Sequence, residues 1–242
     1  MESRTFDYVV VGAGSAGAAV AYRLSESGRH SVLVLEAGRE SHPWSRIPVG
    51  FAKLIQNPAA NWLYSSEADE GTGGRKIPVP RGKLLGGSSS INGMVFVRGP
   101  KQDFATWAQL GNRGWRYPGV LPVFKAMEDY QGDGDDGYRG TGGPLKVTES
   151  LETGPIYDAI IEAGKQVGLD SPKDYNGAAQ DGIVMSQTTI RKGRRMSTAH
   201  CYLDPARSRP NLTIQANALT EKLIIKGGKS RGVHHTVTGQ PP

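Results

Sequence analysis

The sequence is poor in cysteine: Cys201 is the single one among 242 residues. One thiol cannot form a disulfide within the chain, and it makes a cysteine-based metal site implausible. Such usage fits a reducing compartment, so we expect a cytoplasmic protein. Cys201 has no identifiable partner base, and we interpret it as a packing residue rather than a nucleophile.

Long hydrophobic runs are also missing. The apolar stretch 9–22 is too short to span a bilayer and is interrupted by glycines. It has neither the basic leader nor the cleavage site of a signal peptide. We therefore expect no membrane span and no targeting segment.

Acidic residues are outnumbered, and the net charge is +6, yet the basic residues are scattered. The densest basic run is Arg191-Lys192-Gly193-Arg194-Arg195, which is short and has no interleaved aromatic residue. We interpret this run as a solvated surface and expect no nucleic-acid partner. A phosphate of a substrate or cofactor is the lesser alternative.

What the sequence has in excess is glycine, with 33 residues and no collagen-like triplet repeat. The first cluster follows an apolar run over 6–11 that predicts a buried strand. A helix is predicted over 18–27 and stops at Gly28, and a second buried strand is predicted over 31–36, ending on Glu36. The turn between the first strand and the helix reads Gly12-Ala13-Gly14-Ser15-Ala16-Gly17.

This order of strand, glycine turn, helix, strand and acid predicts a dinucleotide site. Gly12 allows the tight turn, Gly14 lets backbone approach a pyrophosphate, and Gly17 permits close packing of helix on strand. The N–H groups at the helix start are oriented toward the anion. Glu36 can accept hydrogen bonds from ribose hydroxyls and disfavours the 2′-phosphate of NADP. The pattern leaves FAD and NAD both open, and a glycine turn that binds nothing is the structural alternative.

A second cluster is dense in backbone and hydroxyl donors. It reads Arg81-Gly82-Lys83-Leu84-Leu85-Gly86-Gly87-Ser88-Ser89-Ser90-Ile91-Asn92-Gly93-Met94-Val95. Such a loop suits phosphate or ring heteroatoms that lie against the backbone. Taken alone, it could equally be a structural loop.

The segment 82–99 resembles the signature of the glucose-methanol-choline (GMC) oxidoreductase family, in particular its choline dehydrogenase-like branch. Other segments are similar to that family as well: 11–17, 35–38, 61–64, 103–107, 114–117, 193–199, 202–205 and 209–212. The resemblance thus extends over essentially the whole chain.

The resemblance implies FAD rather than NAD. The fingerprint glycines and the acid would bind the ADP half, and the second cluster would lie along the pyrophosphate and flavin. Some family members attach the flavin through a histidine in this segment, but Ile91 and Asn92 stand here, so we expect non-covalent FAD. The candidate cofactor-binding residues are Gly12, Gly14, Ser15, Ala16, Gly17, Glu36, Ala37, Trp62, Arg81, Gly82, Leu85, Gly86, Gly87, Ser88, Asn92, Gly93, Met94, Val95 and Leu219.

The fold class expected is α/β, a Rossmann-like FAD-binding domain with the beginning of an inserted α+β substrate domain. We expect 1–130 to be the first part of the FAD domain, 131–200 the start of the substrate domain and 201–242 the return to the FAD domain. Strands are predicted over 143–148, 183–190, 211–215 and 218–225, and a helix over 155–167. The acidic loop 131–137 has the wrong spacing for calcium, so we expect no metal.

The family resemblance also implies what this chain lacks. Family members are about twice as long, and a histidine near their C-terminus takes the alcohol proton while hydride passes to the flavin. None of His30, His42, His200, His234 and His235 lies in a comparable sequence context. We therefore expect an N-terminal fragment, inactive alone and poorly soluble unless a second polypeptide completes it.

The function expected of the parent protein is FAD-dependent oxidation of a CH–OH donor, an alcohol dehydrogenase or oxidase. The alternatives are a non-catalytic FAD-binding remnant, an NAD-binding protein without flavin, and a lyase or photochemical member of the same family.

Overall fold

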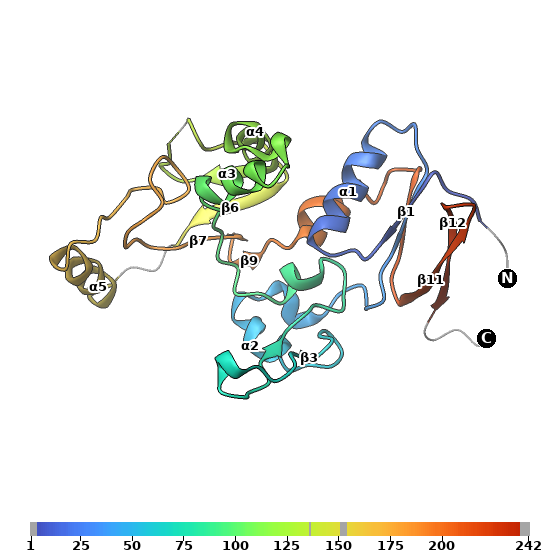
Figure 1. Ribbon diagram of the computed structural model, residues 1–242, viewed down its shortest axis with the longest axis horizontal. Helices are drawn as coiled ribbons and strands as arrows, with labels where there is room; N and C mark the ends of the chain where they lie inside the picture. Colours follow the sequence, from blue (N-terminus) through green and yellow to red (C-terminus); the bar gives the residue numbers. More distant parts are fainter. Residues whose placement is uncertain (1–3, 136, 151–153, 238–242) are drawn as a thin grey trace. The chain divides into compact units, whose positions relative to one another are not determined.

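The computed structural model describes residues 4–135, 137–150 and 154–237 (Figure 1). The chain forms two compact units. The first unit combines Met1–Gly93 with Gly193–Pro242, and the second is Met94–Lys192. These divisions differ from the boundaries expected at 130 and 200, because helices α3 (Lys101–Gln109) and α4 (Tyr117–Met127), which precede residue 130, belong to the second unit. The assignment of FAD and substrate roles to the predicted segments stays a prediction.

The first unit is built on a parallel three-stranded sheet in the order β1-β2-β10. Its strands are β1 (Tyr8–Val11), β2 (Val32–Leu35) and β10 (Leu212–Gln215). Helix α1 (Ser15–Glu26) connects β1 to β2, as the sequence predicts, and Gly28 follows it at φ +72°. The predicted α/β fold with its βαβ unit is confirmed.

The two faces of this sheet are covered by different elements. Val10 contacts the α1 side, where its Cγ1 would lie 3.3 Å from a Cβ on Gly17. On the other face, Leu33 and Leu35 pack against Ala218 of the hairpin formed by β11 (Ala218–Lys226) and β12 (Lys229–Val237). The sheet thus obtains its core from one helix and one antiparallel hairpin.

Strand β1 corrects one sequence prediction. A buried strand is expected at 6–11, but Val9 is 36% exposed and Val11 is 53% exposed. Val9 and Val11 pair with Leu33 and Leu35 in register and therefore share their face. In the described sheet β1 lies at the edge, and the hairpin packs over β2.

The rest of the first unit consists of short elements and includes a small core of Leu54, Ala60, Leu84 and Ile91. In chain order these elements are η1 (Pro43–Arg46), η2 (Pro48–Gly50), α2 (Phe51–Leu54), β3 (Tyr64–Ser65), η3 (Glu70–Thr72), β4 (Pro78–Val79), η4 (Gly87–Ser90), β9 (Arg194–Arg195), η6 (Ala199–Leu203) and α6 (Asp204–Ala206). Of these, η6 is a π-helical turn, and η1 to η4 are 3₁₀ turns.

The second unit contains a three-stranded sheet of β5 (Glu128–Gln131), β6 (Leu145–Glu149) and β7 (Gln187–Thr188), in that order. Strands β5 and β6 are parallel, and β7 is antiparallel to β6. The predicted strand at 143–148 is found as β6, and the predicted helix at 155–167 is found as α5 (Pro155–Gln166). The predicted strand at 183–190 is found as two short strands. The elements of the unit are α3 (Lys101–Gln109), η5 (Arg113–Trp115), α4 (Tyr117–Met127), β5 (Glu128–Gln131), β6 (Leu145–Glu149), α5 (Pro155–Gln166), β7 (Gln187–Thr188) and β8 (Ile190–Arg191).

The core of the second unit includes a buried group of charged side chains. The Glu128 carboxylate lies 2.6 Å from Nη2 of Arg98 and 3.1 Å from Nε of Arg139. Arg139 also pairs with Asp174 at 3.2 Å. Two guanidinium groups thus face two carboxylates, which compensates their charges inside the unit.

None of the helices in the described ranges is long and apolar enough to cross a membrane.

Candidate cofactor site

The first glycine turn connects β1 to α1. Gly12 adopts φ +90° and donates its N–H to the Leu35 carbonyl at 2.7 Å. A Cβ on Gly17 would lie 1.9 Å from the Gly12 carbonyl oxygen, so only glycine lets α1 start this close to the strand. In the described part of the chain, no side chain caps the start of α1 at Gly14. The first N–H groups of α1 therefore remain available to an anion.

The second glycine turn is joined to the first through backbone. Gly86 N–H donates to the Ala13 carbonyl at 2.8 Å, and Gly86 and Gly87 have φ angles of +85° and +52°. A Cβ on Gly87 would lie 2.7 Å from the Cα of Gly14. The two turns thus meet without intervening side chains, next to the start of α1. We call this arrangement of Gly12–Gly17 and Gly82–Ser88 the glycine cradle.

Gly82 of the cradle and Gly38 also lie where two backbone segments approach closely. A Cβ on Gly82 would lie 2.2 Å from the carbonyl carbon of Gly87, and Gly82 N–H donates to the Ser88 hydroxyl at 3.2 Å. A Cβ on Gly38 would lie 1.9 Å from the carbonyl carbon of Lys83. Any side chain at these positions would push the segments apart.

Glu36 lies at the end of β2 and is buried. Its carboxylate oxygens accept backbone N–H groups, one from Ala13 at 2.9 Å and the other from Gly38 at 2.8 Å. Burial raises the pKa of this carboxyl, while the two N–H donors act in the opposite direction. Each oxygen keeps a further lone pair, so the expected contact with ribose stays a prediction.

Asn61 fixes the segment that contains Trp62 and Arg81, a role that sequence reasoning missed. Its side-chain oxygen accepts the N–H groups of Arg81 at 2.9 Å and Leu63 at 3.0 Å. Trp62 stacks on Tyr64 with ring centroids 5.8 Å apart. The exposed Arg81 side chain bonds to the Pro80 carbonyl at 3.0 Å. The adjacent pair Asn61-Trp62 is the sequence signal that could have suggested this role.

The loop after Gly87 forms hydrogen bonds with Arg195 and Thr198. The Ser89 hydroxyl accepts the Thr198 N–H at 3.0 Å and donates to the Gly86 carbonyl at 2.6 Å. Arg195 Nη1 donates to the Ser89 carbonyl at 3.2 Å and to Asn92 Oδ1 at 2.7 Å. The interpretation of the basic run as solvated surface is therefore wrong for Arg195, which is fully buried.

The predicted site residues do not all fall in one unit. Met94 and Val95 belong to the second unit, where the Met94 carbonyl accepts the Thr189 N–H at 2.9 Å and Val95 is exposed. Leu219 lies in β11 and is partly exposed, one residue after Ala218, whose N–H donates to the Glu36 carbonyl at 2.8 Å. The other candidate residues all belong to the first unit.

Comparison with known proteins decides the family. The sequence profile of the GMC oxidoreductases matches residues 6–240. The chain belongs to the GMC oxidoreductase family. The resemblance stated from the sequence is thus confirmed.

The relatives of this GMC chain include an oxygen-dependent choline dehydrogenase from Rhizobium johnstonii, 47% identical over 228 residues. The match covers 94% of the chain and 41% of that protein, so the chain spans less than half the length of this relative. The choline dehydrogenase of Brucella suis is 46% identical with the same coverage.

Two solved structures share the fold. Pyridoxine 4-oxidase from Mesorbium loti superposes with a TM-score of 0.91 at 37% identity, covering 97% of this chain and 47% of its own. An FAD-dependent oxidoreductase from Chaetomium thermophilum gives 0.88 at 27% identity, covering 98% of this chain and 42% of its own. The predicted fold and family are confirmed together by these matches.

Each histidine of this GMC chain has a local structural environment. His42 Nδ1 accepts the Trp44 N–H at 3.2 Å, and His200 Nδ1 lies 2.7 Å from Asp204 Oδ2. His30 packs edge-on against Tyr8, and the other two histidines lie in β12. The expectation that none acts as a catalytic base stays a prediction.

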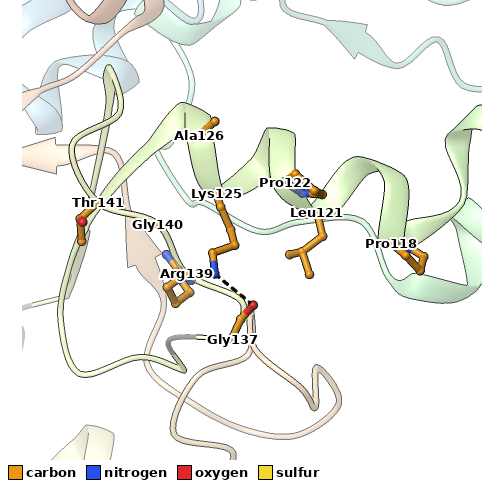
Figure 2. Close-up of a pocket in the computed structure, with 9 residues that line it drawn as sticks. All are labelled: Pro118, Leu121, Pro122, Lys125, Ala126, Gly137, Arg139, Gly140 and Thr141. Carbon is orange, nitrogen blue, oxygen red and sulfur yellow. Dashed lines mark hydrogen bonds between the residues drawn. The ribbon is translucent and has the colours of Figure 1, made fainter.

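A hollow of ≈ 760 Å³ lies within the second unit, between α4 and the loop 137–141 (Figure 2). Pro118, Leu121 and Pro122 of α4 line it together with Lys125, whose ammonium reaches the Gly137 carbonyl at 3.4 Å. This hollow contains none of the cradle residues. Among the residues that the structure describes, no group of three metal-ligating side chains lies together.

Proposed function

We propose that this chain forms the FAD-binding part of a flavin-dependent oxidoreductase that acts on the CH–OH group of a small alcohol. The observation that carries the proposal is the backbone contact between Gly14 and Gly87 at the uncapped start of α1. A ligand with a pyrophosphate fits this cradle, because it needs close backbone approach and free N–H donors rather than side chains. The choline dehydrogenase relatives support choline or a similar alcohol as substrate.

The residues proposed to hold FAD act through distinct groups. The α1 N–H groups of Ser15, Ala16 and Gly17 would bind the pyrophosphate, and Glu36 would bind the ribose. The second turn and Asn92 would face the flavin side. Ile91 is buried and Asn92 is exposed at the position where some relatives attach the flavin through histidine, which supports non-covalent binding. The remaining proposed contacts are Gly12, Gly14, Ala37, Trp62, Arg81, Gly82, Leu85, Gly86, Gly87, Ser88, Gly93, Met94, Val95 and Leu219.

FAD, when bound, would supply the two-electron acceptor for alcohol oxidation. The residues of this chain would bind and orient it, and the buried surroundings of Leu85 and Gly87 would exclude water from one side. The base that takes the alcohol proton would lie in the part of the family fold that this chain does not span. We therefore propose that a second polypeptide carrying that part is required for turnover.

A second candidate function is cofactor binding without catalysis. It is favoured by the histidine environments, since His42 and His200 are each engaged in local hydrogen bonds. Under this alternative the chain would hold FAD and leave it oxidised in the presence of any alcohol.

The absorbance spectrum of the purified chain with FAD, followed by anaerobic addition of choline, separates these functions. We expect a bound-flavin spectrum that choline does not bleach, and bleaching once a polypeptide covering the rest of the family fold is added. Bleaching by the chain alone would contradict the missing base. Persistent oxidised flavin in the completed complex would favour binding without catalysis.

We also propose a cytoplasmic location. Cys201 is the single cysteine of the sequence and is buried, so the protein does not depend on an oxidising compartment for a disulfide. Localisation of a tagged chain in cell fractions tests this proposal.

A further inference from the structure

Three arginine side chains are buried among the residues that the structure describes: Arg98, Arg139 and Arg195, which are 4%, 6% and 0% exposed. Arg98 and Arg139 both lie against the carboxylate of Glu128. Arg195 forms no ion pair with any carboxylate in the described ranges. A buried charge without a counter-charge is costly for a folded protein, so its presence requires an explanation.

The contacts of Arg195 point to the second glycine turn. Nη1 donates to the Ser89 carbonyl and to Asn92 Oδ1, whereas Nε and Nη2 are buried and have no acceptor in the described chain. Burial lowers the pKa of Arg195 to about 10, which leaves the guanidinium charged at neutral pH. The guanidinium charge of Arg195, which no carboxylate of the described chain balances, thus lies in contact with the loop that follows Gly87.

A purely structural role does not account for this arrangement. Two hydrogen bonds to a carbonyl and an amide oxygen could be made by a neutral side chain, without the desolvation of a cation. Replacing a buried charge with a neutral group of similar volume often leaves stability unchanged or raises it. Residues that break such rules are expected at functional sites.

We propose that Arg195 is a positioning residue for FAD, which fixes the Ser89–Asn92 loop and whose charge is balanced by the pyrophosphate of the cofactor rather than by a carboxylate of the protein. This inference rests on the proposed FAD binding. In a site from which water is excluded, opposite charges attract without direct contact. The apoprotein therefore retains an unbalanced cation that the holoprotein neutralises.

Thermal melting of the full chain, with and without ligand, tests the inference on four proteins: the parent, Arg195→Gln, Arg195→Lys and Arg194→Gln. Arg194 is the matched control, because it is the exposed neighbour and its replacement removes the same charge. FAD is the charged probe, and riboflavin is the probe without a pyrophosphate. The affinity of each protein for both probes is measured by flavin fluorescence.

Without ligand, we expect Arg195→Gln to melt at or above the temperature of the parent. Its affinity for FAD falls by about tenfold, while its affinity for riboflavin changes little. Arg195→Lys and Arg194→Gln keep the FAD affinity of the parent. This combination of results distinguishes an effect of the charge at position 195 from an effect of side-chain packing there.

Four results would overturn the inference. A ligand-free Arg195→Gln variant that melts well below the parent, or fails to fold, makes the role structural. Equal losses of FAD and riboflavin affinity show that the pyrophosphate does not sense the charge. A parent chain that binds riboflavin and FAD equally, or neither, overturns the proposed cofactor site and this inference with it, whereas normal FAD binding by Arg195→Gln overturns the inference alone.

Discussion

At the residue scale, the glycine cradle depends on positions where an added methyl group would overlap with backbone atoms. Gly17 and Gly87 show this most directly, since an added Cβ would meet the Gly12 carbonyl oxygen in the first case and the Gly14 Cα in the second. Both contacts are with backbone, which cannot turn aside as a flexible side chain can. The chemistry that such a surface suits is an extended anionic ligand lying against peptide groups.

The substitution Gly87→Ala tests this closeness. The new methyl group would lie 2.7 Å from the Gly14 Cα, so the two turns must separate. We expect the affinity for FAD to fall by at least about tenfold, because the backbone donors then lose their alignment with the pyrophosphate. Equilibrium titration of FAD measures the change.

Gly28→Ala is the matched control for Gly87→Ala. Gly28 also has a positive φ, +72°, but a Cβ there would meet no described atom within 4 Å. Both variants carry the strain of a left-handed backbone, about 1 kcal/mol, and only Gly87→Ala should lose FAD. Equal affinities in the two variants would show that contact between the turns is unimportant.

Sequence reasoning reached Gly12, Gly14 and Gly17 because their spacing fixes backbone geometry locally. It did not reach Arg195, since a basic run is indistinguishable from a solvated surface until the fold buries one member of it. The role of Glu36 was predictable only in part. Its place at the end of β2 was predictable, but its two bonds to backbone N–H groups depend on how β2 and two glycine segments meet.

At the element scale, strands and helices with simple hydrophobic patterns were predictable. The strands β2 and β10 lie within one residue of their expected bounds, whereas α1 begins three residues before and ends one residue before the predicted helix. Helix α4 was not predicted, because it contains Pro118 near its start and Pro122 in its interior. Proline in the first turn costs the helix no hydrogen bond, because an N–H there has no partner inside the helix. In the interior of a helix, proline removes a hydrogen bond and normally indicates that the helix ends.

The strand β5 gives a pH-dependent prediction through Asp129. Its carboxylate lies 2.9 Å from Lys146 of β6 and 2.6 Å from Arg191 of β8. Burial alone would raise the pKa of Asp129, but hydrogen bonds from Gly142, Lys146 and Arg191 outweigh it and hold the pKa well below its usual range. The carboxylate therefore stabilises the second unit when it is ionised.

This stabilisation is fully present above the unfolded pKa of an aspartate, about 3.9, and is lost as the pH falls through the lower folded value. Asp129→Asn should lower the free energy of unfolding at neutral pH by about 1–3 kcal/mol and should flatten its fall in acid. Urea unfolding over a series of pH values measures both effects. Asp133→Asn is the control, since Asp133 pairs with Lys173 on an exposed surface and should change little.

At the scale of the whole molecule, the exposed face and edge of β1 have a consequence for association. Strand β1 lies at the edge of the described sheet, where one side of its backbone has no neighbouring strand. The side chains of Tyr8, Val9 and Val11 on this strand are exposed. Such an edge pairs readily with other chains. The relatives are more than twice as long as the matched region, and we propose that the remaining part of the family fold covers this edge.

We expect the chain alone to self-associate in a concentration-dependent way, and Val11→Lys to reduce this association without unfolding the protein. Val20→Lys on α1 is the control, because Val20 is similarly exposed, at 47% against 53%, but does not lie on the sheet. Sedimentation velocity over a range of concentrations reports the change. A monomeric parent chain, or equal effects of the two substitutions, would show that the β1 edge does not drive association.

The central claim is that the two glycine turns of the first unit form an FAD site. Calorimetric titration of the folded chain with FAD, and in parallel with NADP, tests it most directly. The account predicts saturable binding of FAD at one site and no binding of NADP, because Glu36 occupies the position where a 2′-phosphate would need a cation. A chain that is folded by circular dichroism and takes up no FAD, or binds NADP as well as FAD, would contradict it.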